Sequence, residues 1–483
     1  MDIGHSEARA KEEALKYVRE LYDENMWISG KYICRLESAI ERDGLTVGDV
    51  QKLIASKPQS VAFAKRMFAN SCRGLTVGAP YFRFENVIFP VGRESVVTVL
   101  RLYRYQRLNG RFRVVVSPYY DYAYSAFASF APFVREVTVR NGRIEITFFF
   151  DHEDMYTVSV FYLLDGDEIL IFKGGVYALE EDLYGKRFYK ADLHIHTTFS
   201  DGIEAPELVV ASARERGMDI IAVTDHNSFD GSLSAIEKAE EFGLDLTVLT
   251  GVEYAMSYSP MHILHIGADR SVSPDYLGAQ LAQREETRKL IEENRHCPCD
   301  AVAYACTQVL LDEIEKAGGI SVLAHPYWKP IQNSGKRLDT PEKLFVELAK
   351  LKRFTGYEIV SGSPLGHRRV SHMQASLVNE LAGGAFDFPI LGITDSHHYT
   401  TDGICGKHYT IIISDSKNKK DVLEALRKGQ CVAVDAEGDD PLCYGNHRLN
   451  KLALFLISNY FPERDRRARL EAMTVKEKYV YDQ

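Results

Sequence analysis

The feature that most constrains this chain is a series of short apolar segments, most of which end in residues able to bind a metal ion. Apolar runs of this length are typical of strands buried on both faces of a parallel sheet. Seven segments begin at Tyr189, Asp219, Leu246, Ile263, Gly319, Tyr357 and Pro389. In six of them histidine, aspartate or glutamate lies at or near the C-terminal end. Because the catalytic groups of parallel barrels gather at that end, the pattern predicts one shared site.

The first segment shows how a strand can present several ligands at once. Side chains alternate between the two faces of a strand, so Asp192, His194 and His196 project to the same side. A single Asp-x-His-x-His pattern fits a solvent-exposed strand about equally well. The recurrence of ligand-type residues after later strands favours a metal site instead.

The ordered motifs resemble those of the PHP (polymerase and histidinol phosphatase) superfamily of metal-dependent hydrolases. The resemblance covers roughly residues 189 to 415, and its motifs are Asp192–Gly202, Thr224–Asn227, Gly251–Glu253, His265–Gly267, Ala324–Pro326 and Thr394–His397. It implies an α/β fold, a distorted seven-stranded (β/α) barrel of the PHP type, with two or three divalent ions.

The resemblance also implies a ligand set. One ion is expected on His194, His196, Glu253 and Asp395. A second is expected on Glu253, His265 and His325, and a third on Asp201, His226 and His397. Glu253 would bridge two ions. His262 competes with His265 for one position, and the His-Ile-Gly context favours His265. Asp192 and Asp225 are interpreted as groups that orient the ligands.

The expected chemistry follows from these ligand types. Imidazole and carboxylate together suit zinc, iron or manganese, and the absence of cysteine disfavours a closed structural zinc site. Such ions lower the pKa of bound water, so Glu253, Asp395 and Asp201 are expected to act in catalysis through a metal-activated hydroxide. The basic residues expected to hold substrate phosphate are Lys329, Arg368 and Arg369.

The rest of the chain divides by pattern into further segments. Residues 1–75 show helical periodicity, and residues 76–188 are rich in β-branched and aromatic residues, which predicts an antiparallel β-rich accessory domain. Two Asn-Gly pairs, Asn109-Gly110 and Asn141-Gly142, are hairpin-turn signals. The barrel is expected over 189–435, followed by a helical extension over 436–483. Clustered tyrosines such as Tyr119, Tyr120, Tyr122 and Tyr124 are interpreted as sheet packing rather than a binding platform.

Composition limits the partners. A net charge of -10 over 483 residues argues against duplex nucleic acid as a partner, but a small phosphorylated substrate fits because metal ions supply local positive charge. Without a signal-peptide pattern or a run of membrane-spanning length, we expect a cytoplasmic protein with no membrane contact. Eight scattered cysteines fit a reducing compartment. The oligomeric state is not predicted.

Three functions are compatible with this sequence. The preferred one is a metal-dependent phosphoesterase acting on a small phosphomonoester or nucleotide. A carbamate or carboxylic ester hydrolase is the alternative, because the same hydroxide would attack an acyl carbon. A noncatalytic scaffold is disfavoured because all nine expected ligand positions are filled.

Overall fold

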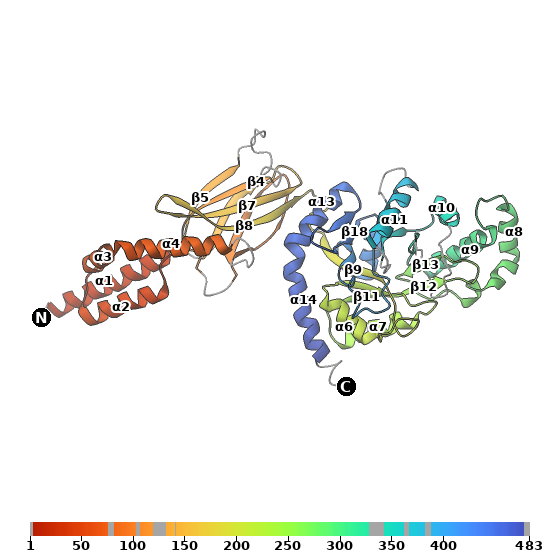
Figure 1. Ribbon diagram of the computed structural model, residues 1–483, viewed down its shortest axis with the longest axis horizontal. Helices are drawn as coiled ribbons and strands as arrows, with labels where there is room; N and C mark the ends of the chain where they lie inside the picture. The colour runs from red at the N-terminus through yellow and green to blue at the C-terminus, as the bar shows by residue number, and fades with distance from the viewer. Residues whose placement is uncertain are drawn as a thin grey trace. The chain divides into compact units, whose positions relative to one another are not determined.

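The structure is a computed structural model that describes residues 3–75, 82–102, 107–118, 132–140, 142–327, 342–361, 367–381 and 388–477. Its chain divides into two compact units, residues 1–184 and 185–483 (Figure 1). No helix among these residues is long and apolar enough to cross a membrane. The tyrosines 119, 120, 122 and 124 lie outside the described residues.

The first unit begins with helices α1 (Ile3–Glu24), α2 (Gly30–Asp43), α3 (Val47–Ala55) and α4 (Pro58–Leu75). Local sequence explains where α3 begins. The Thr46 hydroxyl accepts from the backbone N–H of Asp49, whose carboxylate in turn accepts from the backbone N–H of Thr46. Apolar residues at helical spacing then pack together, including Ala14, Val18, Leu36 and Ile40.

Two sheets complete this unit. Their strands are β1 (Phe82–Phe84), β2 (Ile88–Pro90), β3 (Glu94–Arg101), β4 (Gly110–Pro118), β5 (Phe133–Val139), β6 (Arg143–Phe149), β7 (Met155–Leu164) and β8 (Asp167–Leu179). One sheet has the order β2-β8-β7-β4-β5 and the other β1-β3-β6. Along β7, buried and half-buried residues alternate, as expected where one face packs on a core.

Two features of this region differ from the expectation of a purely antiparallel region with Asn-Gly hairpins. Strand β2 runs parallel to β8. Gly110 begins β4, whose partners are β5 and β7, and Gly142 precedes β6, which pairs with β3 in the other sheet. Gly110 and Gly142 therefore do not lie between strands that pair with each other among the described residues. Asn141 itself lies outside the described residues.

The second unit contains two mixed sheets. Their strands are β9 (Arg187–Ile195), β10 (Ile220–Val223), β11 (Thr247–Leu249), β12 (Gly251–Ala255), β13 (His262–Ile266), β14 (Ile320–Leu323), β15 (Gly356–Val360), β16 (Ile390–Gly392), β17 (His408–Ser414), β18 (Cys431–Asp435) and β19 (Leu442–Tyr444). The orders are β11-β10-β9-β17-β18-β19 and β12-β13-β14-β15-β16. Leu193 and Ala222 of the first sheet share one core with Leu264, Val322 and Leu391 of the second.

The strand directions correct one prediction. The pairs β9–β10, β10–β11, β14–β15 and β15–β16 are parallel as expected, but β13 runs antiparallel to both β12 and β14. An antiparallel strand brings its first residue, rather than its last, to the end where its neighbours finish. Isolated parallel bridges link His226 to Glu253 and Ile195 to Ser396, so the two sheets meet at that end.

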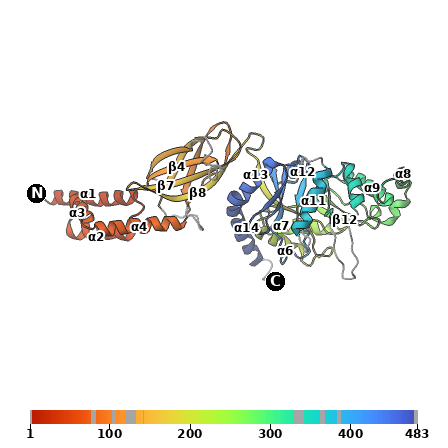
Figure 2. The same cartoon turned by 45° about the horizontal axis from the view of Figure 1, so that its top comes forward.

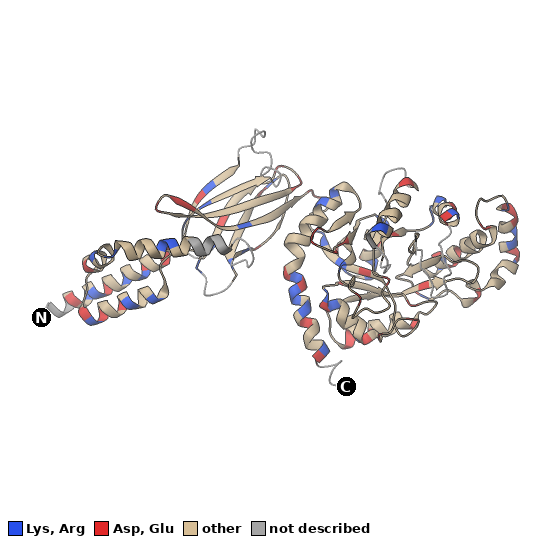
Figure 3. Ribbon diagram, viewed as in Figure 1, with Lys and Arg blue, Asp and Glu red and all other residues tan. Residues whose placement is uncertain are grey.

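Helices cover these sheets. They are α6 (Pro206–Glu215), α7 (Asp230–Glu241), α8 (Glu285–Glu293), α9 (Ala301–Ala317), α10 (Glu342–Lys350), α11 (His367–Leu381), α12 (Lys419–Arg427), α13 (His447–Phe455) and α14 (Phe461–Val475), with short helical turns η1 (Pro274–Tyr276), η2 (Ala279–Gln283) and η3 (Leu456–Tyr460). Charged residues concentrate on the helices (Figure 3). The C-terminal α14 packs against α6 (Figure 2), where Glu471 and Arg214 form an ion pair of 2.9 Å.

Candidate metal centre

The predicted ligand positions lie at or just beyond the ends of strands in the second unit. His194 is in β9 and His196 follows it, Glu253 is in β12, and Asp395 and His397 follow β16. Backbone hydrogen bonds join these segments: Asp395 N–H donates to the carbonyl of His194 at 3.0 Å, and His196 N–H donates to the carbonyl of Ser396 at 2.9 Å. The meeting of β9 with the segment after β16 therefore places four of these side chains in one region.

The most buried cluster consists of His194, His196, Glu253 and Asp395. The Nε2 atoms of His194 and His196 lie 3.1 Å apart, and each lies 3.2 Å from Glu253 Oε2 and 3.2 Å from Asp395 Oδ1. Ligands placed tetrahedrally at about 2.0–2.1 Å from an ion are separated by about 3.3 Å. The four residues expected on the first ion are thus brought together, with the spacing of ligands that could share one cation.

Glu253 lies at the centre of the site and faces histidines with both carboxylate oxygens. Its Oε2 lies within 3.2 Å of nitrogens of His194, His196 and His226, and yet this buried oxygen accepts no hydrogen bond with good geometry. Its Oε1 lies 2.9 Å from His262 Nδ1 and 3.1 Å from His325 Nε2. A buried carboxylate oxygen surrounded by imidazole nitrogens without a hydrogen bond fits a bridging ligand of divalent cations.

One predicted ligand is not at the site. His265 Nε2 lies 2.7 Å from the carbonyl of Gly318 and its Nδ1 lies 3.3 Å from the Tyr254 hydroxyl, away from the clusters. His262 groups with Glu253 and His226 instead. The reason is the antiparallel direction of β13, which puts its first residue at the site and His265 toward the opposite end. The structure therefore replaces His265 by His262 beside Glu253 and His325.

A third group contains His196, Asp201, His226 and His397. Asp201 Oδ2 lies 3.3 Å from His397 Nε2 and 3.7 Å from His226 Nε2. The Asp201 side chain is 56% exposed, whereas that of Glu253 is 1% exposed. The three residues expected on a third ion are thus brought together, at the solvent side of the site.

The carboxylates and imidazoles of the site shift one another's pKa values. Burial disfavours charge on His194, but the carboxylates of Glu253, Asp395 and Glu358 outweigh it and raise its pKa well above the usual value. The pKa of Glu253 is held well below its usual value, against burial, by His194 and His262. Burial lowers the pKa of His226 to about 4, so this imidazole is neutral near neutral pH. Protons on the imidazoles thus neutralise charge that a divalent cation would neutralise when bound.

Three further carboxylates support the ligands. Glu358 Oε1 lies 2.7 Å from His194 Nδ1, on the opposite side of the ring from the cluster. Asp192 accepts from the backbone N–H and hydroxyl of Thr394, next to Asp395, at 3.1 and 2.7 Å. Asp225 accepts from the backbone N–H and hydroxyl of Thr197, next to His196, both at 2.7 Å. Asp192 and Asp225 therefore have the orienting contacts expected of them.

Sequence reasoning missed Glu358. It lies within the apolar segment of the sixth predicted strand, whereas most of the expected ligands lie at or after strand ends. A carboxylate inside a strand buried throughout is the signal that identifies such a residue, since burying a charge is costly unless it is paired.

The backbone at the site is unusual in two ways. Asn227, His325 and Asp395 all have positive φ, at 50°, 24° and 52°, a conformation that concentrates at functional sites in proteins. Gly202 lies against the strand end: a Cβ atom there would lie 2.5 Å from the carbonyl carbon of His196. Only glycine allows the loop that carries Asp201 to pass so close.

The expected substrate-binding residues are not brought to the site by any described contact. Lys329 lies outside the described residues, as does the side chain of Arg368. Arg369 is exposed near the start of α11. Their contact with a substrate phosphate stays a prediction.

Fold and site together define an α/β protein with a site for divalent metal built from histidines and carboxylates. Residues 192–334 match the family model described as PHP domain. The match to a PHP domain thus covers this part of the second unit.

Relatives match over limited lengths. The 5'-3' exoribonuclease Rnm of Salmonella typhimurium is 34% identical over 106 residues, which is 21% of this chain and 36% of that protein. The phosphoribosyl 1,2-cyclic phosphate 1,2-diphosphodiesterase of Eggerthella lenta is 35% identical over 83 residues, 16% of this chain and 30% of that protein. The chain thus spans about a third of the length of each of these two relatives.

A solved structure from Bacteroides vulgatus, described as a two-domain protein containing predicted PHP-like metal-dependent phosphoesterase, is also similar. It has a TM-score of 0.40 and 21% identity, and the match covers 57% of this chain and 71% of that one.

Proposed function

We propose that this protein is a metal-dependent phosphoesterase that hydrolyses a small phosphorylated substrate. The observation that carries the proposal is the central position of Glu253, whose two oxygens face two separate sets of imidazoles. Divalent ions, when bound by these residues, would supply a hydroxide nucleophile near neutral pH and would neutralise charge on phosphoryl oxygens. The names of two relatives, a cyclic-phosphate diphosphodiesterase and an exoribonuclease, support phosphoester chemistry.

The residues of the chain have distinct roles in this proposal. His194, His196, Glu253 and Asp395 form the buried position, Glu253 with His262 and His325 the second, and Asp201, His226 and His397 the outer one. Each set offers carboxylates and imidazoles, and an imidazole that has lost its proton is a donor of the kind that zinc, manganese and iron accept. We propose two or three ions on these residues.

Three carboxylates, Glu253, Asp395 and Asp201, act in catalysis through the metal. By holding the ions, they would fix the position of the positive charge that meets the substrate. The Asp201 side chain is solvent-accessible, so a substrate phosphate can reach the outer set directly. In phosphoryl transfer most of the catalysis comes from positioning and from charge neutralisation, which suits a rigid cluster of this kind. Lys329, Arg368 and Arg369 remain proposed contacts to non-bridging phosphate oxygens.

We also propose that β9, β10 and β12 to β16 together form the distorted seven-stranded barrel of the PHP type. The parallel bridges His226–Glu253 and Ile195–Ser396, which link the two sheets, support this arrangement. We further propose that the chain has four parts. They are a helical segment (1–75), an antiparallel β-rich accessory domain (76–188), the metal-dependent hydrolase barrel (189–435) and a C-terminal helical extension (436–483).

The test assays the purified protein, with added manganese, on three model esters. They are p-nitrophenyl phosphate, bis(p-nitrophenyl) phosphate and p-nitrophenyl acetate. We expect turnover of at least one phosphate ester, and loss of that turnover in His194→Ala with an unchanged circular dichroism spectrum. Turnover of the acetate alone would instead support the carboxylic or carbamate ester hydrolase. A short 5'-phosphorylated oligoribonucleotide then distinguishes a nucleotide substrate from a smaller phosphomonoester.

A further inference from the structure

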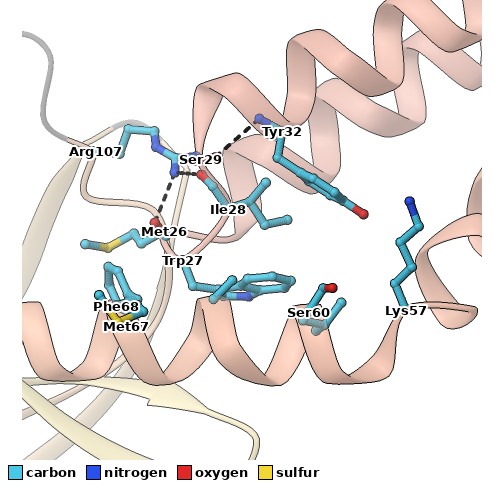
Figure 4. A pocket seen from close by; sticks show the side chains of 12 residues that line it. Met26, Trp27, Ile28, Ser29, Tyr32, Lys57, Ser60, Met67, Phe68 and Arg107 are labelled. Carbon is cyan, nitrogen blue, oxygen red and sulfur yellow. Dashed lines mark hydrogen bonds between the residues drawn. The ribbon is translucent and has the colours of Figure 1, made fainter.

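A cavity in the first unit lies apart from the metal centre, which belongs entirely to the second unit. Its volume is about 460 Å³, within the usual range for small-ligand sites of about 300–1,000 Å³. It is bounded by the loop between α1 and α2, by the start of α2 and by α4 (Figure 4). Loop and helices belong to one compact unit, so the cavity is a property of this unit alone.

One part of the cavity is apolar and aromatic. Trp27, Ile28, Val61, Ala64, Met67 and Phe68 line it. In Figure 4 the Trp27 ring lies alongside α4. Flat aromatic groups and the soft thioether of Met67 favour an aromatic ligand, because ring stacking and sulfur–ring contacts stabilise such a group beyond area burial alone.

The other end of the cavity carries polar atoms. In Figure 4 the Tyr32 hydroxyl and the Lys57 ammonium group point to the same end, beyond the Trp27 ring, with Ser60 on the helix below. Among the described lining residues none is acidic, and the two charged side chains are the cations Lys57 and Arg107. The charge of the lining therefore complements an anion.

Arg107 is already committed to the protein. Its guanidinium group donates to the carbonyls of Tyr22, Met26 and Ile28 and stacks 3.7 Å from the Tyr22 ring. It fixes the loop that carries Trp27 and so holds the wall of the cavity in place. Lys65, also on α4, pairs with Asp165. No ion pair of Lys57 occurs within the described part of the chain.

We propose that this cavity binds a small aromatic carboxylate. The aromatic body lies against Trp27, Met67 and Phe68, and the carboxylate accepts hydrogen bonds from Lys57, Tyr32 and Ser60. A site of this kind is independent of the phosphoester chemistry, and it gives the helical part of the first unit a binding role.

The test uses the full-length protein and two probes that differ mainly in charge, 2-naphthoate and the neutral 2-naphthylmethanol, in isothermal titration calorimetry. We expect one naphthoate site, weakened about fivefold or more by Lys57→Gln, in line with a partly exposed ion pair. The exposed Lys52→Gln, whose side chain does not line the cavity, is the matched control. Naphthylmethanol should bind Lys57→Gln and the unmodified protein equally well.

A second variant, Ala64→Phe, fills the cavity and should abolish binding of both probes while circular dichroism shows an intact fold. Because a carboxylate can also bind metal ions, the titration is repeated after chelation and in His194→Ala, where naphthoate binding should persist. Absence of naphthoate binding at about 1 mM, or equal binding by Lys57→Gln and the unmodified protein, would overturn the proposal. Loss of binding on chelation alone would overturn it too, by placing the ligand at the metal centre.

Discussion

Glu358 and His194 form a buried pair in which the Glu358 Oε1 atom lies 2.7 Å from His194 Nδ1. The other oxygen of Glu358 accepts a hydrogen bond of 2.6 Å from the backbone N–H of His325. One fully buried carboxylate therefore positions two residues of the metal centre. A proton on Nδ1, donated to Glu358, leaves Nε2 of His194 free to face a cation.

Glu358→Gln should weaken metal binding without removing any ligand. The amide keeps the size of the side chain but loses the charge that orients His194, and loss of such supporting contacts typically costs about 10–100-fold in metal affinity. Equilibrium dialysis with elemental analysis measures the effect. The control is Glu342→Gln, an exposed substitution in the first turn of α10. Equal affinities in both variants would contradict the positioning role.

His262 and His265 provide a direct comparison of two histidines in one strand. His262→Ala should lower the amount of bound metal, since His262 faces Glu253 at 2.9 Å. His265→Ala should retain the metal and instead lower the free energy of unfolding by about 1–3 kcal/mol, because the carbonyl of Gly318 loses its buried partner. Metal content and urea denaturation separate the two effects. The opposite result would restore His265 as a ligand.

Metal uptake should depend on pH. Burial lowers the pKa of His196, but Asp395 and Glu253 outweigh this effect and raise it to about 9 in the metal-free protein. His196 is thus protonated near neutral pH and must lose a proton to bind a cation. Apparent affinity should rise by about tenfold per pH unit for each proton released, until the pH passes that pKa. Calorimetry in buffers of different ionisation enthalpy counts the protons, and a count of zero would contradict this expectation.

Gly202→Ala should disturb the outer part of the metal centre. The added methyl group would lie 2.5 Å from the carbonyl carbon of His196, so the loop with Asp201 has to move. We expect a lower metal content and a destabilisation of about 1–3 kcal/mol. At Gly403 an added Cβ meets nothing within 4 Å and φ is not positive, so Gly403→Ala is the matched control. Full metal content in Gly202→Ala would show that Asp201 is dispensable.

Much of the metal centre could be predicted because its residues follow strand ends in a simple way. The alternation along β9 and the position of Asp395 after β16 predict three residues of the buried cluster, His194, His196 and Asp395, and the resemblance adds Glu253. Parallel neighbours share a direction, so their C-terminal ends meet without any knowledge of distant contacts. For these residues the local sequence pattern is enough to predict that they lie at the same end of the sheets.

The remaining features depend on strand direction, which the local pattern does not encode. A short buried apolar run has the same composition in either direction, so the sequence predicts a parallel strand here and favours His265 over His262, whereas β13 is antiparallel. The Asn-Gly pairs were interpreted as hairpins for a similar reason, since a turn signal does not state which strands will pair. Glu358 was missed because its partner His194 lies 164 residues away in the sequence.

The exposure of Asp201 bears on how this protein behaves during purification. A cation held at that solvent-facing position would exchange with the medium faster than one enclosed around Glu253. Dilution, dialysis or a chelating purification step will strip it first. If the proposed function holds, preparations with different histories should then differ in specific activity although their polypeptide is identical, and adding back a divalent metal should erase the difference.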